Sequence, residues 1–139
     1  MNYKIISKFI KDISFEIPSA ETFLLLEKEI PKYEVKVNIS SKQFKNKVIE
    51  VNTVLSLKPK EEVKRKILTE ITLACLVSVD ETVKDKQTLE RIVLIKVPTD
   101  TYPILYDAFI YLFKLSGLKN INIKKDVNFE ELYNKNIKS

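Results

Sequence analysis

Four segments of the chain alternate between apolar and polar positions with a period of two, the pattern of strands in a half-buried sheet. The alternation runs through residues 33–40 and 49–58, and a third run extends over residues 63–79. A shorter alternation covers residues 12–17 and is ended by Pro18, which cannot continue a ladder of hydrogen bonds. We expect these strands to form an antiparallel sheet with one covered face. The stretch 20–30 is ambiguous between a short helix and a packed loop.

The second half of the chain has the spacing of helices. Residues 85–96 carry apolar side chains at helical intervals, and a longer apolar helix is predicted over residues 100–116, with Thr99 as its N-cap. Gly117, the expected residue just after a helix end, stops it. Asn128 opens a capping pattern for a last short helix over residues 129–135.

Strands followed by helices favour an α+β fold. We therefore expect a four-stranded antiparallel sheet with one long helix and one or two shorter helices packed on it. The 139 residues suit one domain with one hydrophobic core, spanning residues 1–139.

The helix at 100–116 is apolar on almost every side. Its charged residues Asp100, Asp107 and Lys114 recur every seven positions and form one narrow polar stripe. A helix of this kind must be covered nearly all round, and one four-stranded sheet covers only one side of it. Either the preceding helix and the C-terminal segment cover the rest, or a second subunit or an apolar ligand does.

The outward face of the predicted sheet has an apolar residue within a polar row. In the third run, Leu68 and Glu70 point away from the core, and the first strand turns Asp12 and Glu16 outward. These residues could form a small acidic patch with one apolar anchor, which is a workable protein-docking site. An ordinary exposed leucine among surface charges explains the same pattern, and composition alone favours that second interpretation.

The composition argues against an enzyme. The chain has no histidine, one glycine and one cysteine. Histidine-based acid–base catalysis, most transition-metal sites and glycine-rich phosphate loops are therefore excluded. Cys75 lies in an apolar run typical of a core. We expect no catalytic residue, no metal site and no cofactor.

The formal net charge is +5, and lysines cluster at residues 42–47, 58–66 and 119–125. Such clusters suggest nucleic-acid binding, but arginine, which makes most specific base contacts, occurs only at Arg65 and Arg91. A solvated lysine-rich surface is the better interpretation. No apolar stretch is long enough to span a membrane, and the first 16 residues lack the unbroken apolar run of a signal peptide. We expect a cytoplasmic protein.

Several of these segments resemble the SecB family of protein-export chaperones. Residues 11–16, followed by Pro18, are similar to the first strand of that family, and residues 34–39 resemble its second strand. Pro98 and Pro103 match the pattern that leads into its long helix, and residues 127–132 resemble its last-helix motif. The similarity covers nearly the whole chain.

The resemblance implies a dimer-of-dimers tetramer that binds unfolded preproteins in long apolar grooves without ATP. It also implies that the SecA motor ATPase of the Sec translocase docks on the exposed face of the sheet. The motor-binding positions of the family fall on Asp12, Glu16, Leu68 and Glu70. Its client-binding strand falls on Val35, Val37 and Ile39, and further helix contacts fall on Tyr102, Leu105 and Phe109, for which a plain core role is an equal alternative.

The sequence leaves two other functions open. One is a SecB-like chaperone dedicated to a single partner such as an antitoxin. The other, which the composition makes less attractive, is a basic nucleic-acid-binding protein.

Overall fold

The computed structural model describes residues 2–63, 66–118, 123 and 125–138, so the lysine clusters at 58–66 and 119–125 fall partly outside the described residues. The strands are β1 (Tyr3–Glu16), β2 (Tyr33–Gln43), β3 (Val48–Pro59) and β4 (Leu68–Val79). The helical elements are α1 (Ala20–Glu29), the 3-10 turn η1 (Ile30–Lys32), α2 (Lys86–Arg91), the π-helical turn η2 (Ile92–Lys96), α3 (Val97–Leu115) and α4 (Phe129–Lys138). The predicted α+β fold with a four-stranded antiparallel sheet is confirmed.

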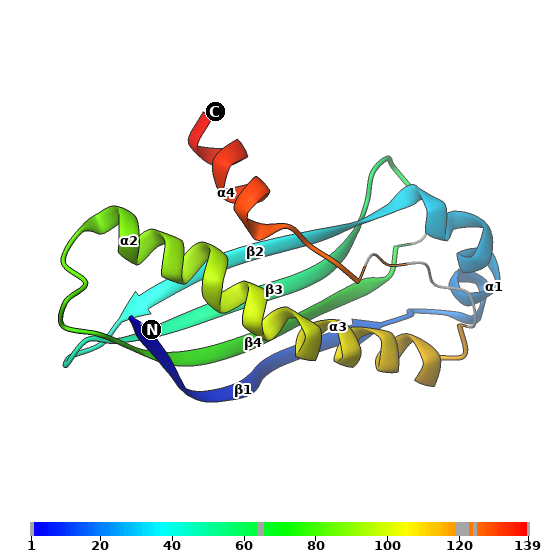
Figure 1. Cartoon of the computed structure of the whole chain (residues 1–139). Helices are drawn as coiled ribbons and strands as arrows, with labels where there is room; N and C mark the ends of the chain where they lie inside the picture. Colours follow the sequence, from blue (N-terminus) through cyan, green and yellow to red (C-terminus); the bar gives the residue numbers. More distant parts are fainter. Residues whose placement is uncertain (1, 64–65, 119–122, 124, 139) are drawn as a thin grey trace.

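The strands lie in the order β1-β4-β3-β2 and every neighbouring pair is antiparallel (Figure 1). The chain passes from β1 at one edge to β2 at the other through α1, which lies at one end of the sheet (Figure 1). Pro18 ends the strand, and the Ser19 hydroxyl then caps α1 by accepting a hydrogen bond of 3.2 Å from the Thr22 amide. The segment that the sequence left ambiguous is therefore a helix.

β1 is much longer than the alternating pattern at residues 12–17 predicted. Its pairing with β4 shifts between Ile5 and Ser7 and again between Ile10 and Asp12. Each shift is a β-bulge that exchanges the two faces of the strand. The period of two is therefore interrupted twice, and only the last third of the strand shows it clearly.

β4 begins at Leu68, later than the predicted start at residue 63. The pairing of β4 with β1 ends at Glu16 and Leu68, and its pairing with β3 ends at Ser56 and Glu70. Lys66 and Ile67, the described residues directly before Leu68, belong to no strand, although Ile67 is buried and its amide donates to the Tyr33 hydroxyl at 3.2 Å.

α2, η2 and α3 form one helical run across one face of the sheet, above β3 and β4 (Figure 1). The prediction that Thr99 caps a separate helix is wrong, because Thr99 lies inside the run and its hydroxyl donates to the Ile95 carbonyl at 2.5 Å. Pro98 has no amide hydrogen to donate within this run. In the structure it occupies the first turn of α3 directly after the π-helical turn, where a missing donor is tolerated.

The predicted end of the long helix is confirmed. Gly117 adopts a positive φ of 98° just after α3. Its amide donates to the Lys114 carbonyl, and the Leu118 amide donates to the Phe113 carbonyl, both at 3.2 Å. These two bonds form a Schellman motif, which requires the left-handed conformation that glycine adopts without strain.

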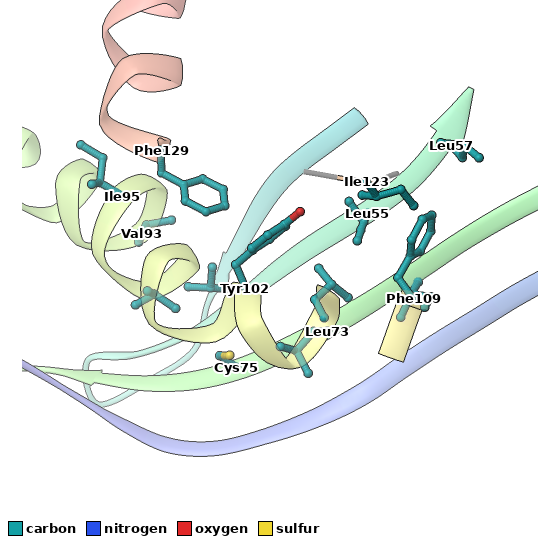
Figure 2. Close-up of a cluster of buried hydrophobic side chains, with 14 of the residues drawn as sticks. Leu55, Leu57, Leu73, Cys75, Val93, Ile95, Tyr102, Phe109, Ile123 and Phe129 are labelled. Carbon is teal, nitrogen blue, oxygen red and sulfur yellow. The ribbon is translucent and has the colours of Figure 1, made fainter. Parts of the chain in front are cut away.

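The core lies between the inner face of the central strands and the underside of α3. Figure 2 shows Tyr102 and Phe109 projecting from α3 toward the sheet, with Phe129 from the start of α4 close to Tyr102. The rings of Tyr102 and Phe129 are 5.8 Å apart, and those of Phe109 and Phe113 are 5.1 Å apart. Asn128 caps α4 as predicted, since its side-chain oxygen accepts from the Glu131 amide at 3.0 Å. The floor is made of buried residues of β3 and β4: Val51, Leu55, Ile71, Leu73, Cys75 and Val77.

Candidate docking and client-binding surfaces

The four residues predicted to bind a motor protein come together on the outer face of the sheet. Glu16 on β1 lies directly opposite Leu68 on β4, and Ser14 lies opposite Glu70. Paired residues of antiparallel strands project to the same face, which here is the face opposite α3. Asp12, two residues further along β1, also lies on this face. Leu68 leaves 46% of its surface exposed.

The carboxylates of this patch differ from the other acidic groups of the outer face. Glu50 on β3 accepts from Lys11 at 2.6 Å and from Asn52 at 2.8 Å, and these bonds hold its pKa below the usual range. Within the described part of the chain, the carboxylates of Asp12, Glu16 and Glu70 form no ion pair. The Ser14 hydroxyl donates to Asp12 at 3.2 Å. The carboxylates of this patch can therefore pair with the basic side chains of a partner protein.

Sequence reasoning missed a recess that adjoins this patch. Its volume is about 340 Å³, and Leu68 forms one wall of it. Two lysines, Lys58 and Lys66, lie on its rim, so positive charge borders the acidic patch on this side. The lining comes from the turn after β1, the end of β3 and the start of β4: Glu16, Pro18, Leu57, Lys58, Pro59, Lys66, Ile67 and Leu68. These segments are far apart in the sequence, and no local pattern indicates that they meet.

A second recess lies on the helix side, along the edge strand β2. It has a volume of about 490 Å³, and two of the predicted client-binding residues, Val37 and Ile39, line it. The opposite walls come from α2, η2 and α4, and we call this recess the β2 groove. Its complete lining is Val37, Asn38, Ile39, Glu90, Leu94, Phe129, Leu132 and Tyr133.

Polar contacts hold α4 at the side of the β2 groove. The Tyr133 hydroxyl donates to Glu90 at 3.1 Å, and Arg91 pairs with Glu130 at 2.6 Å. Burial and the bond to Glu90 raise the pKa of Tyr133, which favours the protonated phenol that donates this bond. The groove is therefore framed by a fixed helix, while Leu132 remains 39% exposed at its mouth.

The other residues proposed for client contact lie elsewhere. Val35 is half-buried against the core, and it does not line the β2 groove. Tyr102, Leu105 and Phe109 are buried beneath α3, with exposed fractions of 3%, 0% and 0%. In this structure the three helix residues are core residues, which is the alternative that the sequence left open.

Two further apolar regions are exposed. On α3, Ile104, Tyr111 and Leu115 project away from the sheet, on the same side as the charged residues Asp107 and Lys114. The edge strand β1 exposes another group, consisting of Ile6, Phe9, Ile10 and Ile13. The helix passes over β3 and β4 and leaves most of β1 uncovered.

The sequence model of one protein family, the preprotein translocase subunit SecB, matches residues 1–139. The chain belongs to the SecB family. The protein-export protein SecB assigned in Pelagibacter ubique (strain HTCC1062) is 43% identical over 132 residues, which cover 95% of this chain and 94% of that protein. The protein-export protein SecB of Dechloromonas aromatica (strain RCB) is 27% identical over 125 residues, covering 90% of this chain and 80% of that protein.

A solved SecB-like structure has the same fold. The SecB-like chaperone of Mycobacterium tuberculosis, in complex with a peptide from the HigA1 antitoxin, superposes with a TM-score of 0.66 at 11% identity. The alignment covers 91% of this chain and 88% of that one. The SecB resemblance of the sequence is thus confirmed for both family and fold. No helix in the described ranges has the length and apolar character needed to cross a membrane.

Proposed function

We propose that this SecB-family chain is a non-enzymatic, ATP-independent chaperone that binds unfolded preproteins and delivers them to the SecA motor in the cytoplasm. The observation that carries the proposal is the β2 groove, a recess with both apolar and polar walls next to an edge strand, in a protein of the export-chaperone family. Unfolded segments expose apolar side chains, and covering them is worth about 25 cal/mol per Å² before ordering costs.

Client binding is expected to centre on Val37, Ile39, Leu94 and Leu132. These side chains supply the apolar surface, and Asn38 and Glu90 supply polar contacts for a client backbone. β2 is also an edge strand, so its outer backbone groups are free of any strand partner within the described residues. A groove of this kind accepts many sequences, because apolar burial and backbone contacts require no particular side chain.

SecA is proposed to dock on the outer-face patch of Asp12, Glu16, Leu68 and Glu70. The support is their position on adjacent strands, the exposed leucine, and carboxylates that form no ion pair with the residues that the structure describes. Because the β2 groove opens on the opposite side of the sheet, a client and the motor can be held at once.

The assembly is proposed to be a homotetramer built as a dimer of dimers. Its support is the apolar surface that a single chain leaves uncovered at Ile104, Tyr111 and Leu115 on α3, and along the edge of β1. Long exposed edge strands are rarely left unpaired in stable proteins. A second copy that pairs at β1 and another that covers α3 would bury both regions.

The decisive experiment is a refolding assay. A slow-folding preprotein is diluted from denaturant with and without this protein, in the absence of ATP, and its folding and light scattering are followed. The proposal expects folding to be arrested at a stoichiometric ratio. The groove variant Ile39→Ser with Leu132→Ser should weaken the arrest about tenfold or more, since each substitution removes about 1–2 kcal/mol of apolar contact.

Leu24→Ser provides the matched control, because Leu24 is 75% exposed on α1 and lies outside the groove. If a panel of clients folds or aggregates unhindered by the native protein, general client holding fails. A chaperone dedicated to a single partner then becomes the better assignment.

A further inference from the structure

The turn between β2 and β3 concentrates lysines around one exposed aromatic ring. Phe44 is 46% exposed, and the Lys42 ammonium lies 5.5 Å from the centre of its ring. Lys45 is exposed, and Asn46 and Lys47 both adopt positive φ angles, of 63° and 59°. The Phe44 amide closes the hairpin by donating to the Val48 carbonyl at 2.8 Å. Figure 1 shows this hairpin at the end of the sheet opposite α1.

Lys47 has a structural role in this hairpin. Its ammonium donates to the Val83 carbonyl at 3.2 Å, which ties the hairpin to the loop before α2. Lys42 lies over the Phe44 ring and opposite Glu50 of β3, and Lys45 is exposed. We call the segment from Lys42 to Lys47 the lysine hairpin.

The surroundings of the lysine hairpin add more positive charge. Lys84 lies beside it across a shared recess, Lys86 begins α2 and lies 4.0 Å from Glu90, and Lys4 lies on β1, opposite Ser78 of β4. Two nearby carboxylates are engaged locally. Asp80 accepts from the Thr82 amide and hydroxyl, both at 2.9 Å, and Asp85 accepts from Thr88 at 2.9 and 2.7 Å. Glu81 is the remaining acidic residue of this loop.

An apolar recess of about 430 Å³ lies directly behind Phe44. Its floor is apolar, while Lys47 and Lys84 stand at its rim. Cationic groups thus border an exposed aromatic ring and a largely apolar recess at this end of the sheet. The apolar members of the lining are Phe44, Val48, Ile49, Val79, Val83 and Leu89.

We propose that the lysine hairpin binds the surface of an anionic phospholipid membrane. Phe44 inserts at the level of the headgroups, and Lys42, Lys45, Lys47 and Lys84 contact the lipid phosphates. Amphipathic surfaces with lysines around an exposed aromatic ring bind anionic bilayers through apolar burial together with electrostatic attraction. A compact group of lysines around one exposed ring at the end of the sheet suits a flat anionic surface, whereas a nucleic acid would track a longer basic stripe.

The position of the lysine hairpin keeps this contact separate from the proposed chaperone surfaces. The acidic patch lies at the start of β4, around Leu68 and Glu70, whereas the lysine hairpin lies beside the end of β4, around Val77 and Ser78. Membrane contact therefore goes beyond the proposed function and is tested without any client or motor.

The first test uses a new fluorophore. The chain contains no tryptophan, so Phe44→Trp introduces a single one. Its emission should shift to the blue when vesicles of phosphatidylcholine and phosphatidylglycerol are added, and should stay unchanged with pure phosphatidylcholine. Leu24→Trp, on α1 at the opposite end of the molecule, should show no shift with either (Figure 1). Equal shifts for both tryptophans, or for both kinds of vesicle, overturn the proposal.

The second test measures vesicle binding by flotation. The triple variant Lys42→Gln, Lys45→Gln, Lys47→Gln should bind phosphatidylglycerol vesicles at least tenfold more weakly, since each lysine near an anionic surface contributes about fivefold. Glutamine keeps a donor for the Val83 carbonyl, so the hairpin can still close. A thermal melt of the variant checks the fold.

The matched control is Lys28→Gln, Lys32→Gln, Lys60→Gln, which removes the same charge near α1. It should bind vesicles within about twofold of the native protein. An equal loss in both triple variants assigns binding to overall charge and overturns the proposal. Absence of vesicle binding at low salt, with binding of mixed nucleic acid retained, overturns it in favour of a nucleic-acid contact.

Discussion

Replacing the exposed leucine and one carboxylate of the outer-face patch with basic residues should strongly weaken motor docking while leaving the fold intact. The perturbation is Leu68→Arg combined with Glu70→Lys. Full burial of a leucine is worth about 1.5–3 kcal/mol, and Leu68 has 46% of its surface still to bury, so docking gains about 1 kcal/mol from it. Replacing the charge of Glu70 converts an attraction into a repulsion, a change of about 1–2 kcal/mol at a partly exposed site. Together the two changes should weaken SecA binding by about thirtyfold or more.

Isothermal titration of purified SecA into the protein measures this affinity directly. Both positions project from the exposed face, so the free energy of unfolding should change by less than about 0.5–1 kcal/mol. Glu34→Lys is a suitable control, because Glu34 also lies on the outer face but on the far edge strand, where it pairs with Lys36 at 3.0 Å. Undiminished SecA affinity in the double variant, or an equal loss in the control, would refute the assignment of the patch.

Three further changes have expected outcomes. Tyr3→Phe removes a hydrogen bond of 2.6 Å to the Asp100 carboxylate and should cost about 1.5 kcal/mol in urea unfolding at pH 7. Burial and the neighbouring Asp100 raise the pKa of Tyr3 from 10.0 to about 12, so this stabilisation is complete below pH 10 and is lost as the pH rises toward 12. The variant should show a flatter loss of stability in that range. Gly117→Ala should cost about 1 kcal/mol, because φ is 98° there while the new Cβ would lie at an ordinary 3.4 Å from the Phe23 ring. Leu115→Asp should lower the mass measured by sedimentation if α3 meets another copy, and an unchanged mass would remove α3 from the interface.

Much of the sheet could be predicted from the sequence because three strands keep a strict period of two. The faces assigned to β2, β3 and β4 agree with burial, with Leu55, Leu73 and Val77 inside and Lys36, Asn52 and Glu70 less buried or exposed. The same parity correctly turned Leu68 and Glu16 outward. Local alternation is sufficient for these assignments, because one covered face fixes the register of each strand.

The order of the strands in the sheet could not be predicted from this alternation. The period of two indicates which face of the sheet a residue occupies, but it does not indicate that β1 lies beside β4. Successive strands are usually neighbours, and here α1 carries the chain across the end of the sheet instead. The proximity of Glu16 to Leu68 therefore follows from topology. The two bulges of β1 hid the alternation of its first two thirds, and the assignment of Thr99 as an N-cap divided α2, η2 and α3, which form one helical run.

The β2 groove was predicted only on its strand side. The alternation of β2 puts Val37 and Ile39 on the covered face, and the SecB resemblance implied their client contact. Leu94, Phe129 and Leu132 reach the groove through the docking of two helices. The contacts that fix this docking are single long-range pairs, such as Arg91 with Glu130. Isolated charges of this kind occur throughout a lysine-rich chain, and nothing in their spacing distinguishes the pair that forms.

The three surfaces can be perturbed independently because one rigid sheet separates them. The β2 groove opens on the helix side, the acidic patch lies on the outer side near the start of β4, and the lysine hairpin projects from the opposite end. Substitutions that share no partner and lie far apart usually have additive effects. Combining the Leu68 and Glu70 changes with the groove changes should therefore give the sum of the two losses in binding free energy. A coupling well above about 0.5 kcal/mol would mean that client and motor influence each other through the sheet, and not merely by occupying opposite faces of it.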